Sequence, residues 1–202
     1  NLHDNLHILG YGVDINNVGF LDDLAGFRAR RIERLRKIVA LLQKQGIEIK
    51  FEELPSDKMR TVGRPHIADL LKKKGVVKTR KQGFGQYVAY GQPAYVPPSG
   101  PDVETAIRAI KKAGGLAVLA HPGAVAEIMD LPAWKAAGLD GIEAFYPAHT
   151  GAATRDFVSL AARHGLFVTA GVDFHGTGSE RDKMTGFEYS DKYFSEIQKL
   201  FI

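Results

Sequence analysis

Three short apolar runs in the second half of the chain constrain its fold more than any other feature. They are LAVLA at 116–120, GIEAF at 141–145 and LFVTA at 166–170. A stretch long enough for one helix separates each run from the next. Short strands of almost entirely apolar residues are typical of parallel sheets that are covered by helices. The sequence therefore predicts an α/β fold with parallel strands at these three positions.

The other elements are predicted from periodicity and from helix start and stop signals. Residues 6–13 are expected to form a further short strand. Apolar residues recur near a 3.6-residue period after Asp22 and Asp23. A long helix is therefore expected to begin at one of these two residues and to end at Gly46. Further helices are expected over 63–75, 103–113 and 190–202. Residues 76–100 are rich in Gly, Pro and Tyr and are expected to be irregular.

Charge is distributed unevenly along the chain. The formal net charge is +4, and residues 20–84 hold 17 Lys and Arg against 8 Asp and Glu, a net of +9. The remainder therefore has a net charge of −5. A basic segment beside an acidic remainder indicates an anion-attracting surface next to a scaffold that binds cations. A solvated helical face rich in Lys and Arg would give the same count.

Polar side chains follow each of the three apolar runs. His121 comes directly after the first run, His149 follows the second, and Asp173 and His175 follow the third. His7 lies on the first predicted strand. Because the carboxyl ends of parallel strands meet at one rim, we expect His121, His149, Asp173 and His175 to face the same rim. As ligands of one metal cluster, His7, His121, Asp173 and His175 are expected to lie within roughly 10 Å of one another.

Asp173 and His175 have the spacing and the chemistry of a metal site. Residues at positions i and i+2 of an extended segment point to the same side. A carboxylate together with an imidazole binds divalent ions such as Zn, Mn or Fe. The chain has no Cys, so a metal would depend on His, Asp and Glu. Each residue has a structural alternative, in which it hydrogen-bonds the backbone, and His149 could bind substrate as well as metal.

Arg64 opens the second predicted helix, within the sequence Gly-Arg-Pro-His. Free backbone N–H groups at a helix start favour phosphate, and an Arg side chain adds a two-pronged donor. Arg64 is therefore a candidate phosphate-binding residue. The structural alternative is an ordinary Arg at a helix start, with His66 as a cap.

Five segments, in order along the chain, resemble the polymerase-and-histidinol-phosphatase (PHP) superfamily of metal-dependent phosphoesterases. They are LHILGYGVD, GRPHIA, LAVLAHPG, GIEAFYPAH and VTAGVDFHG, and they extend from about Leu6 to Gly176. The similarity is to the branch with a helical insert, which includes nucleotide 3′,5′-bisphosphate phosphatases and 5′-to-3′ exoribonucleases.

The resemblance implies a distorted (β/α)₇ barrel with up to three divalent metal ions. It implies that residues 1–16 and 101–202 form the C-terminal part of this PHP-type barrel and that 17–100 form a helical insert domain. The site residues that it implies are His7, His121, Asp173 and His175 as metal ligands, Asp173 and His175 as catalytic residues, and Arg64 and His149 as residues that hold the substrate phosphate.

The N-terminal Asp-x-His-x-His motif of this family, with a further His and a Glu after it, does not occur in the chain. A cluster of metal ions needs more donors than the four candidate ligands supply. We therefore expect the 202 residues by themselves to bind at most one metal ion tightly and to hydrolyse phosphate esters poorly. An N-terminal segment that carries the motif is expected to restore both properties.

These observations predict a manganese-, zinc- or iron-dependent hydrolase. Its expected substrate is a phosphorylated small molecule, a nucleotide such as a nucleoside 3′,5′-bisphosphate, or a short RNA end. One alternative is a histidinol-phosphatase-like enzyme with a non-nucleotide substrate, and another is a non-catalytic module that binds nucleic acid through the basic segment. The chain has no run of 18 apolar residues that would predict a membrane span. The absence of Cys suits a reducing cytoplasm.

Overall fold

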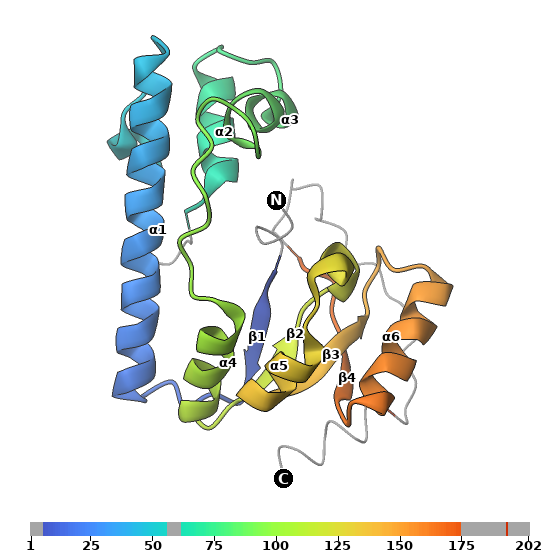
Figure 1. Ribbon diagram of the computed structural model, residues 1–202. Coiled ribbons are helices and arrows are strands. Elements are labelled where there is room, and N and C mark those ends of the chain that lie inside the picture. The colour runs from blue at the N-terminus through green and yellow to red at the C-terminus, as the bar shows by residue number, and fades with distance from the viewer. Residues whose placement is uncertain (1–5, 56–61, 175–192, 194–202) are drawn as a thin grey trace. The chain divides into compact units, whose positions relative to one another are not determined.

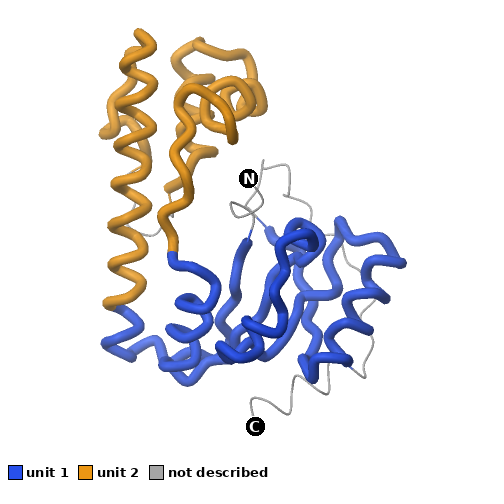
Figure 2. The backbone as a smooth tube through the Cα atoms, viewed as in Figure 1, with its two compact units in different colours: residues 1–21, 101–202 blue, residues 22–100 orange. Residues whose placement is uncertain are grey.

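The computed structural model describes residues 6–55, 62–174 and 193, and Figure 1 shows the elements that they form. The chain divides into two compact units, one with residues 1–21 and 101–202 and the other with residues 22–100, coloured separately in Figure 2. Each unit has an apolar core of its own. The helix expected over 190–202 lies outside the described residues, apart from Tyr193.

A four-stranded sheet organises the first unit. Its strands are β1 (Ile8–Tyr11), β2 (Leu116–Leu119), β3 (Leu139–Phe145) and β4 (Phe167–Ala170), in that spatial order. Strands β2, β3 and β4 are parallel, as the three apolar runs predict, whereas β1 is antiparallel to β2. The α/β architecture is thus confirmed. The described strands form this one sheet, so the complete barrel stays a prediction.

Side-chain alternation gives the sheet two different faces. Three helices accompany it, namely α4 (Val103–Lys112), α5 (Leu131–Ala137) and α6 (Gly151–Arg163) (Figure 1). Ile142 of β3 belongs to a buried core cluster with Ile107 of α4, Trp134 of α5 and Phe157 of α6. Successive residues of a strand point to opposite faces. Glu143 therefore points away from the face that these helices cover.

Helix α1 (Val18–Lys44) begins earlier than the sequence predicts. The Asn17 Oδ1 atom accepts a hydrogen bond from the Phe20 backbone N–H at 2.9 Å, so Asn17 caps the helix. The predicted start at Asp22 or Asp23 is wrong, because Asn17 supplies a cap further upstream. Within the described ranges no helix, α1 included, is both long enough and apolar enough to cross a membrane.

The second unit packs its helices around an apolar core. Its main elements besides α1 are α2 (Arg64–Lys73), α3 (Arg80–Gly83) and a π-helical turn (Phe84–Val88). Leu35, Ile38 and Leu42 of α1 are buried in this core, where they meet Leu71 of α2. The 3.6-residue period of α1 matches this buried stripe in the C-terminal part of the helix, whereas Leu24 and Ile32 of the same period are exposed.

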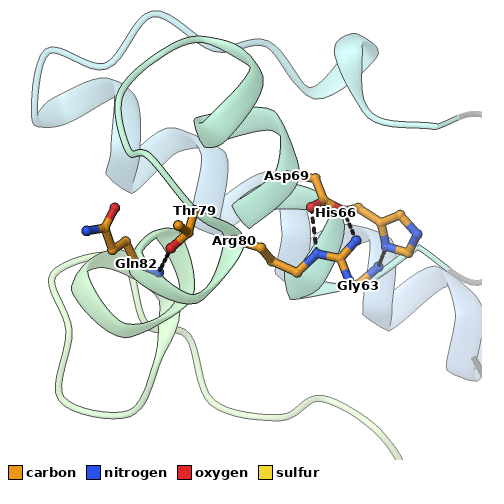
Figure 3. A network of polar contacts seen from close by, with 6 residues as sticks. All are labelled: Gly63, His66, Asp69, Thr79, Arg80 and Gln82. Carbon is orange, nitrogen blue, oxygen red and sulfur yellow. Dashed lines mark hydrogen bonds and ion pairs between the residues drawn. The ribbon is translucent and has the colours of Figure 1, made fainter. Parts of the chain in front are cut away.

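The segment 76–100, which was expected to be irregular, contains α3. The Gln82 N–H donates to Thr79 Oγ1 at 3.1 Å and begins this helix. Arg80 then makes a two-pronged ion pair with Asp69 of α2, with both N–O distances 2.6 Å (Figure 3). The expectation is wrong here because a cap and a tertiary ion pair stabilise one helical turn that has no apolar period.

The cap of α4 gives a test of how local interactions hold the helices of the first unit. The Thr105 N–H donates to Asp102 Oδ1 at 2.7 Å. Hydrogen bonds from the Thr105 side chain and backbone hold the pKa of Asp102 below its usual range. Because the folded pKa is the lower one, this contribution to stability is present above about pH 4 and is lost as the pH falls through the folded pKa.

We therefore expect Asp102→Ala to lower the free energy of unfolding by about 1 kcal/mol at pH 7 and by less near pH 2.5. Urea denaturation followed by the fluorescence of Trp134, the only Trp of the chain, measures this difference. The control Asp102→Asn should retain most of the cap at both pH values. A cost of Asp102→Ala that does not change with pH would contradict the prediction.

Candidate functional site

His7 and His121 are in direct contact at one end of the sheet. His7 precedes β1 and His121 follows β2, and the antiparallel pairing of these strands puts the start of β1 beside the end of β2. The Ala120 N–H donates to the His7 carbonyl oxygen at 3.1 Å. The His7 Nδ1 and His121 Nε2 atoms are 3.1 Å apart. The structure thus brings together two of the four predicted metal ligands.

The backbone at His121 adopts a strained conformation. Its φ of 29° and ψ of 60° lie in the left-handed region, which costs a non-glycine residue about 1–2 kcal/mol. The buried His121 N–H donates to Glu143 Oε2 at 2.9 Å. A hydrogen bond to a charged group contributes about 1.5–3 kcal/mol. The bond to Glu143 is therefore large enough to offset the strain at His121.

Asp173 is a second strained position. Its φ is 50°. In the described part of the chain, Asp173 and His121 are the two non-glycine residues with a positive φ. The Asp173 Oδ2 atom is buried. His175 lies outside the described residues. Within those residues, no group of three or more His, Asp or Glu side chains is arranged to hold a metal ion. His7 and His121 lie together, and the convergence of Asp173 and His175 with them stays a prediction.

Glu143 is a buried carboxylate that sequence reasoning missed. It is 5% exposed, and burial raises its pKa above the usual range while the bond from His121 lowers it. A Cβ added to Gly171 would clash with the Glu143 Oε1 atom. The signal in the sequence was one acidic residue inside the apolar run GIEAF, where a carboxylate is costly to bury without a partner.

Tyr11 of β1 and Thr169 of β4 gather with Glu143. Glu143 and Thr169 are partners in the register of β3 and β4. Burial raises the pKa of Tyr11, the Thr169 hydroxyl lowers it, and the charge of Glu143 raises it further. Polar groups from three strands therefore lie close to one another on the sheet.

The His149 ring contacts the backbone of two other segments. The Gly123 N–H donates to its Nε2 atom at 3.2 Å, and its Nδ1 atom lies 2.9 Å from the Ala144 carbonyl oxygen. A carbonyl only accepts, so Nδ1 carries the proton in this arrangement. The ring also packs on Phe157, with the centroids 4.9 Å apart. The phosphate-binding role of His149 stays a prediction, and it would require the bond from Gly123 to break.

Arg64 is the first residue of α2, as the sequence predicts. The Gly63 N–H donates to His66 Nδ1 at 3.1 Å, so His66 caps this helix (Figure 3). The Arg64 guanidinium lies over the Phe84 ring, 4.9 Å from its centroid, and its Nη1 donates to the Val88 carbonyl oxygen at 3.3 Å. The role of Arg64 in binding phosphate stays a prediction.

Comparison with known proteins identifies relatives with named activities, although no family model matches the chain. The chain is 34% identical over 181 residues to the 3′,5′-nucleoside bisphosphate phosphatase of Chromobacterium violaceum, and the match covers 86% of this chain and 63% of that protein. It is 34% identical over 184 residues to the 5′-3′ exoribonuclease Rnm of Salmonella typhimurium, with coverages of 84% and 60%. The chain thus spans about three fifths of the length of both relatives.

A solved structure extends the comparison to the fold. A protein from Bifidobacterium adolescentis, described as a metal-dependent phosphoesterase, matches with a TM-score of 0.82 and 31% identity over 96% of this chain and 71% of that chain. The chain belongs to the PHP superfamily. The resemblance that the five sequence segments indicate is confirmed.

The donors at the strand ends fit a divalent metal ion of the kind that this superfamily uses. Two imidazole nitrogens on one tetrahedral ion lie about 3.4 Å apart, because each metal–nitrogen distance is about 2.1 Å. In the structure the His7 and His121 rings share a hydrogen bond, and its N–N separation of 3.1 Å is close to this value. Imidazole nitrogens and a carboxylate from Asp173 are donors that Zn, Mn and Fe accept.

Replacing the His149 ring tests whether it has a structural role. His149→Phe retains an aromatic ring beside Phe157 but removes both hydrogen bonds. We expect it to lower the free energy of unfolding by about 1–3 kcal/mol, because the Ala144 carbonyl and the Gly123 N–H lose their partner. Urea denaturation with Trp134 fluorescence measures the change.

The matched control is His164→Phe at the end of α6, which should change the free energy of unfolding by less than about 0.5 kcal/mol. Unchanged stability of His149→Phe would show that the two hydrogen bonds contribute little to the free energy of unfolding and would contradict the structural role.

Proposed function

We propose that this chain is a metal-dependent phosphoesterase that hydrolyses a phosphate ester of a nucleotide or of a short RNA end, such as a nucleoside 3′,5′-bisphosphate. The contact between His7 and His121 at the strand ends carries this proposal. It occurs in a chain whose relatives include a nucleoside bisphosphate phosphatase and an exoribonuclease. Adjacent imidazole nitrogens are ligands that divalent transition metals take in proteins.

We assign metal binding to His7, His121, Asp173 and His175, and catalytic roles to the last two. When bound, a divalent ion such as Mn²⁺ polarises phosphoryl oxygens and lowers the pKa of water towards neutrality. The contribution of the protein is to hold the donor atoms in place. His121 is held by its backbone bond to Glu143, and Asp173 presents a carboxylate from the segment that follows β4.

We assign the substrate phosphate to His149 and to Arg64. The Arg64 guanidinium is always charged, and its fork of donors matches the oxygens of a phosphate. The rings of Phe84 and Tyr95 lie 4.9 Å and 6.0 Å from its central carbon and restrict its orientation. The net charge of +9 over residues 20–84 supports the attraction of an anionic substrate.

The relatives favour a nucleotide or RNA substrate over histidinol phosphate, since both are named for activity on such molecules. A binding module without catalysis predicts a different behaviour in solution. Its affinity for RNA would fall steeply with salt, and no phosphate would be released.

Phosphate release from a nucleoside 3′,5′-bisphosphate tests the proposed reaction. We expect slow release by the Mn²⁺-loaded chain, its loss on chelation with EDTA, and a still slower reaction with histidinol phosphate. Asp173→Asn should lower kcat/KM by about 100-fold or more, because loss of a metal ligand exceeds the 10–100-fold effect of losing an outer partner.

The matched control is Asp156→Asn, the same substitution at an exposed position of α6, which should leave kcat/KM unchanged. Equal rates for Asp173→Asn and the unaltered protein would overturn the assignment of Asp173. Salt-sensitive RNA binding without any release of phosphate would favour the binding module.

Substitution of Arg64 tests the phosphate-binding assignment separately. Arg64→Ala should raise KM for the bisphosphate by about 10-fold or more, because a charge-assisted pair with phosphate is lost, and Mn²⁺ stoichiometry should not change. Arg64→Lys should recover part of the loss, since Lys retains the charge but not the fork. Unchanged KM in Arg64→Ala would remove Arg64 from the site.

A further inference from the structure

Glu143 contacts the backbone on both sides of its own strand. On one side, its Oε2 atom accepts the His121 N–H at 2.9 Å. On the other side, a Cβ added to Gly171 would have only atoms of the Glu143 carboxyl group as its three nearest neighbours, with Cδ at 3.0 Å and Oε1 closer. Strand β3 lies between β2 and β4. One side chain therefore links the segments that follow the two neighbouring strands.

The two linked segments carry two of the proposed metal ligands. His121 has a φ of 29°, and its N–H is the group that Glu143 holds. Asp173, with a φ of 50°, lies two residues after Gly171. The φ of Gly171 is outside the left-handed region. The Glu143 carboxylate, and not the backbone conformation, is therefore what excludes a side chain at position 171.

The packing of the apolar core does not require an acidic residue at position 143. Glu143 is 5% exposed, and its neighbours Ile142 and Ala144 already pack in the core. An apolar side chain of similar size would be buried without the penalty of removing a charge from water. What it could not do is accept the buried His121 N–H.

We propose that Glu143 is a positioning residue for the metal centre, and that its carboxylate fixes the backbone of His121 while keeping position 171 free of a side chain. The inference rests on the proposed function, because it assigns His121 and Asp173 to metal binding. Glu143 acts through the backbone on either side of it, as outer partners orient the ligands of a metal.

Two substitutions of similar size separate the hydrogen bond from the volume of the side chain. Glu143→Gln retains an oxygen that can accept the His121 N–H, whereas Glu143→Met does not. We expect Glu143→Met to weaken Mn²⁺ binding, measured by calorimetry, by about 10–100-fold. Glu143→Gln should rescue most of the affinity. In the metal-free protein, the backbone amide resonance of His121 should shift upfield in Glu143→Met and stay near its place in Glu143→Gln.

A double-mutant cycle tests the contact with Gly171 and does not depend on the folding of Glu143→Met. Gly171→Ala alone should weaken Mn²⁺ binding by about 10-fold, because the new Cβ displaces the carboxylate. In a Glu143→Ala background the space is already open, so Gly171→Ala should add less than about 2-fold. Such non-additivity is the mark of residues in contact.

The outcomes distinguish this inference from the proposed function. Unaltered Mn²⁺ affinity in Glu143→Met, or independent effects of Gly171→Ala and Glu143→Ala, would overturn the positioning role. Failure of the unaltered protein to bind Mn²⁺ would overturn the proposed function. The His121 amide resonance would then still decide whether Glu143 holds this backbone, and an unchanged resonance in Glu143→Met would show that it does not.

Discussion

The burial of one face of the sheet beneath α4, α5 and α6 is the packing constraint on which the first unit depends. Ile142 and Ala144 of β3 are fully buried in this core. Side-chain alternation then sends the residue between them, Glu143, to the other face. The same constraint aligns the carboxyl ends of the parallel strands, where polar residues follow each apolar run.

The turn after β2 shows how side chains from elsewhere can hold a strained backbone. The His121 N–H donates to Glu143 of β3, and the Gly123 N–H donates to His149 from the loop after β3. Both bonds go from the backbone of one segment to side chains of the next. A turn held at two points can keep the His121 ring beside His7. Such a fixed backbone is the preorganisation that the proposed metal site would require from its surroundings.

Local hydrogen bonds have a comparable role in the second unit. His66 caps α2, Thr79 caps α3, and the Arg80–Asp69 ion pair joins these two helices. Together they define the short helices that follow the long α1. Arg64 lies at the start of α2 with its guanidinium over the Phe84 ring. The conformation of this proposed phosphate-binding residue therefore depends on aromatic packing as well as on its place in the sequence.

The sequence by itself determined the three parallel strands, because short and almost entirely apolar runs are typical of strands covered by helices. It also placed His121, His149 and Asp173 after these strands. It determined the apolar period of α1 as well, of which the C-terminal part is buried. Five ordered segments indicated the family. The sequence could not show that Asn17 would cap α1 ahead of Asp22, or that α3 would form, because these depend on hydrogen bonds and ion pairs without an apolar period. Only the tertiary structure decided that β1 is antiparallel, which brings His7 to His121, and that Glu143 reaches the backbone of two neighbouring segments. The physical reason is that strand direction and the partners of a buried carboxylate are set by residues far apart in the chain.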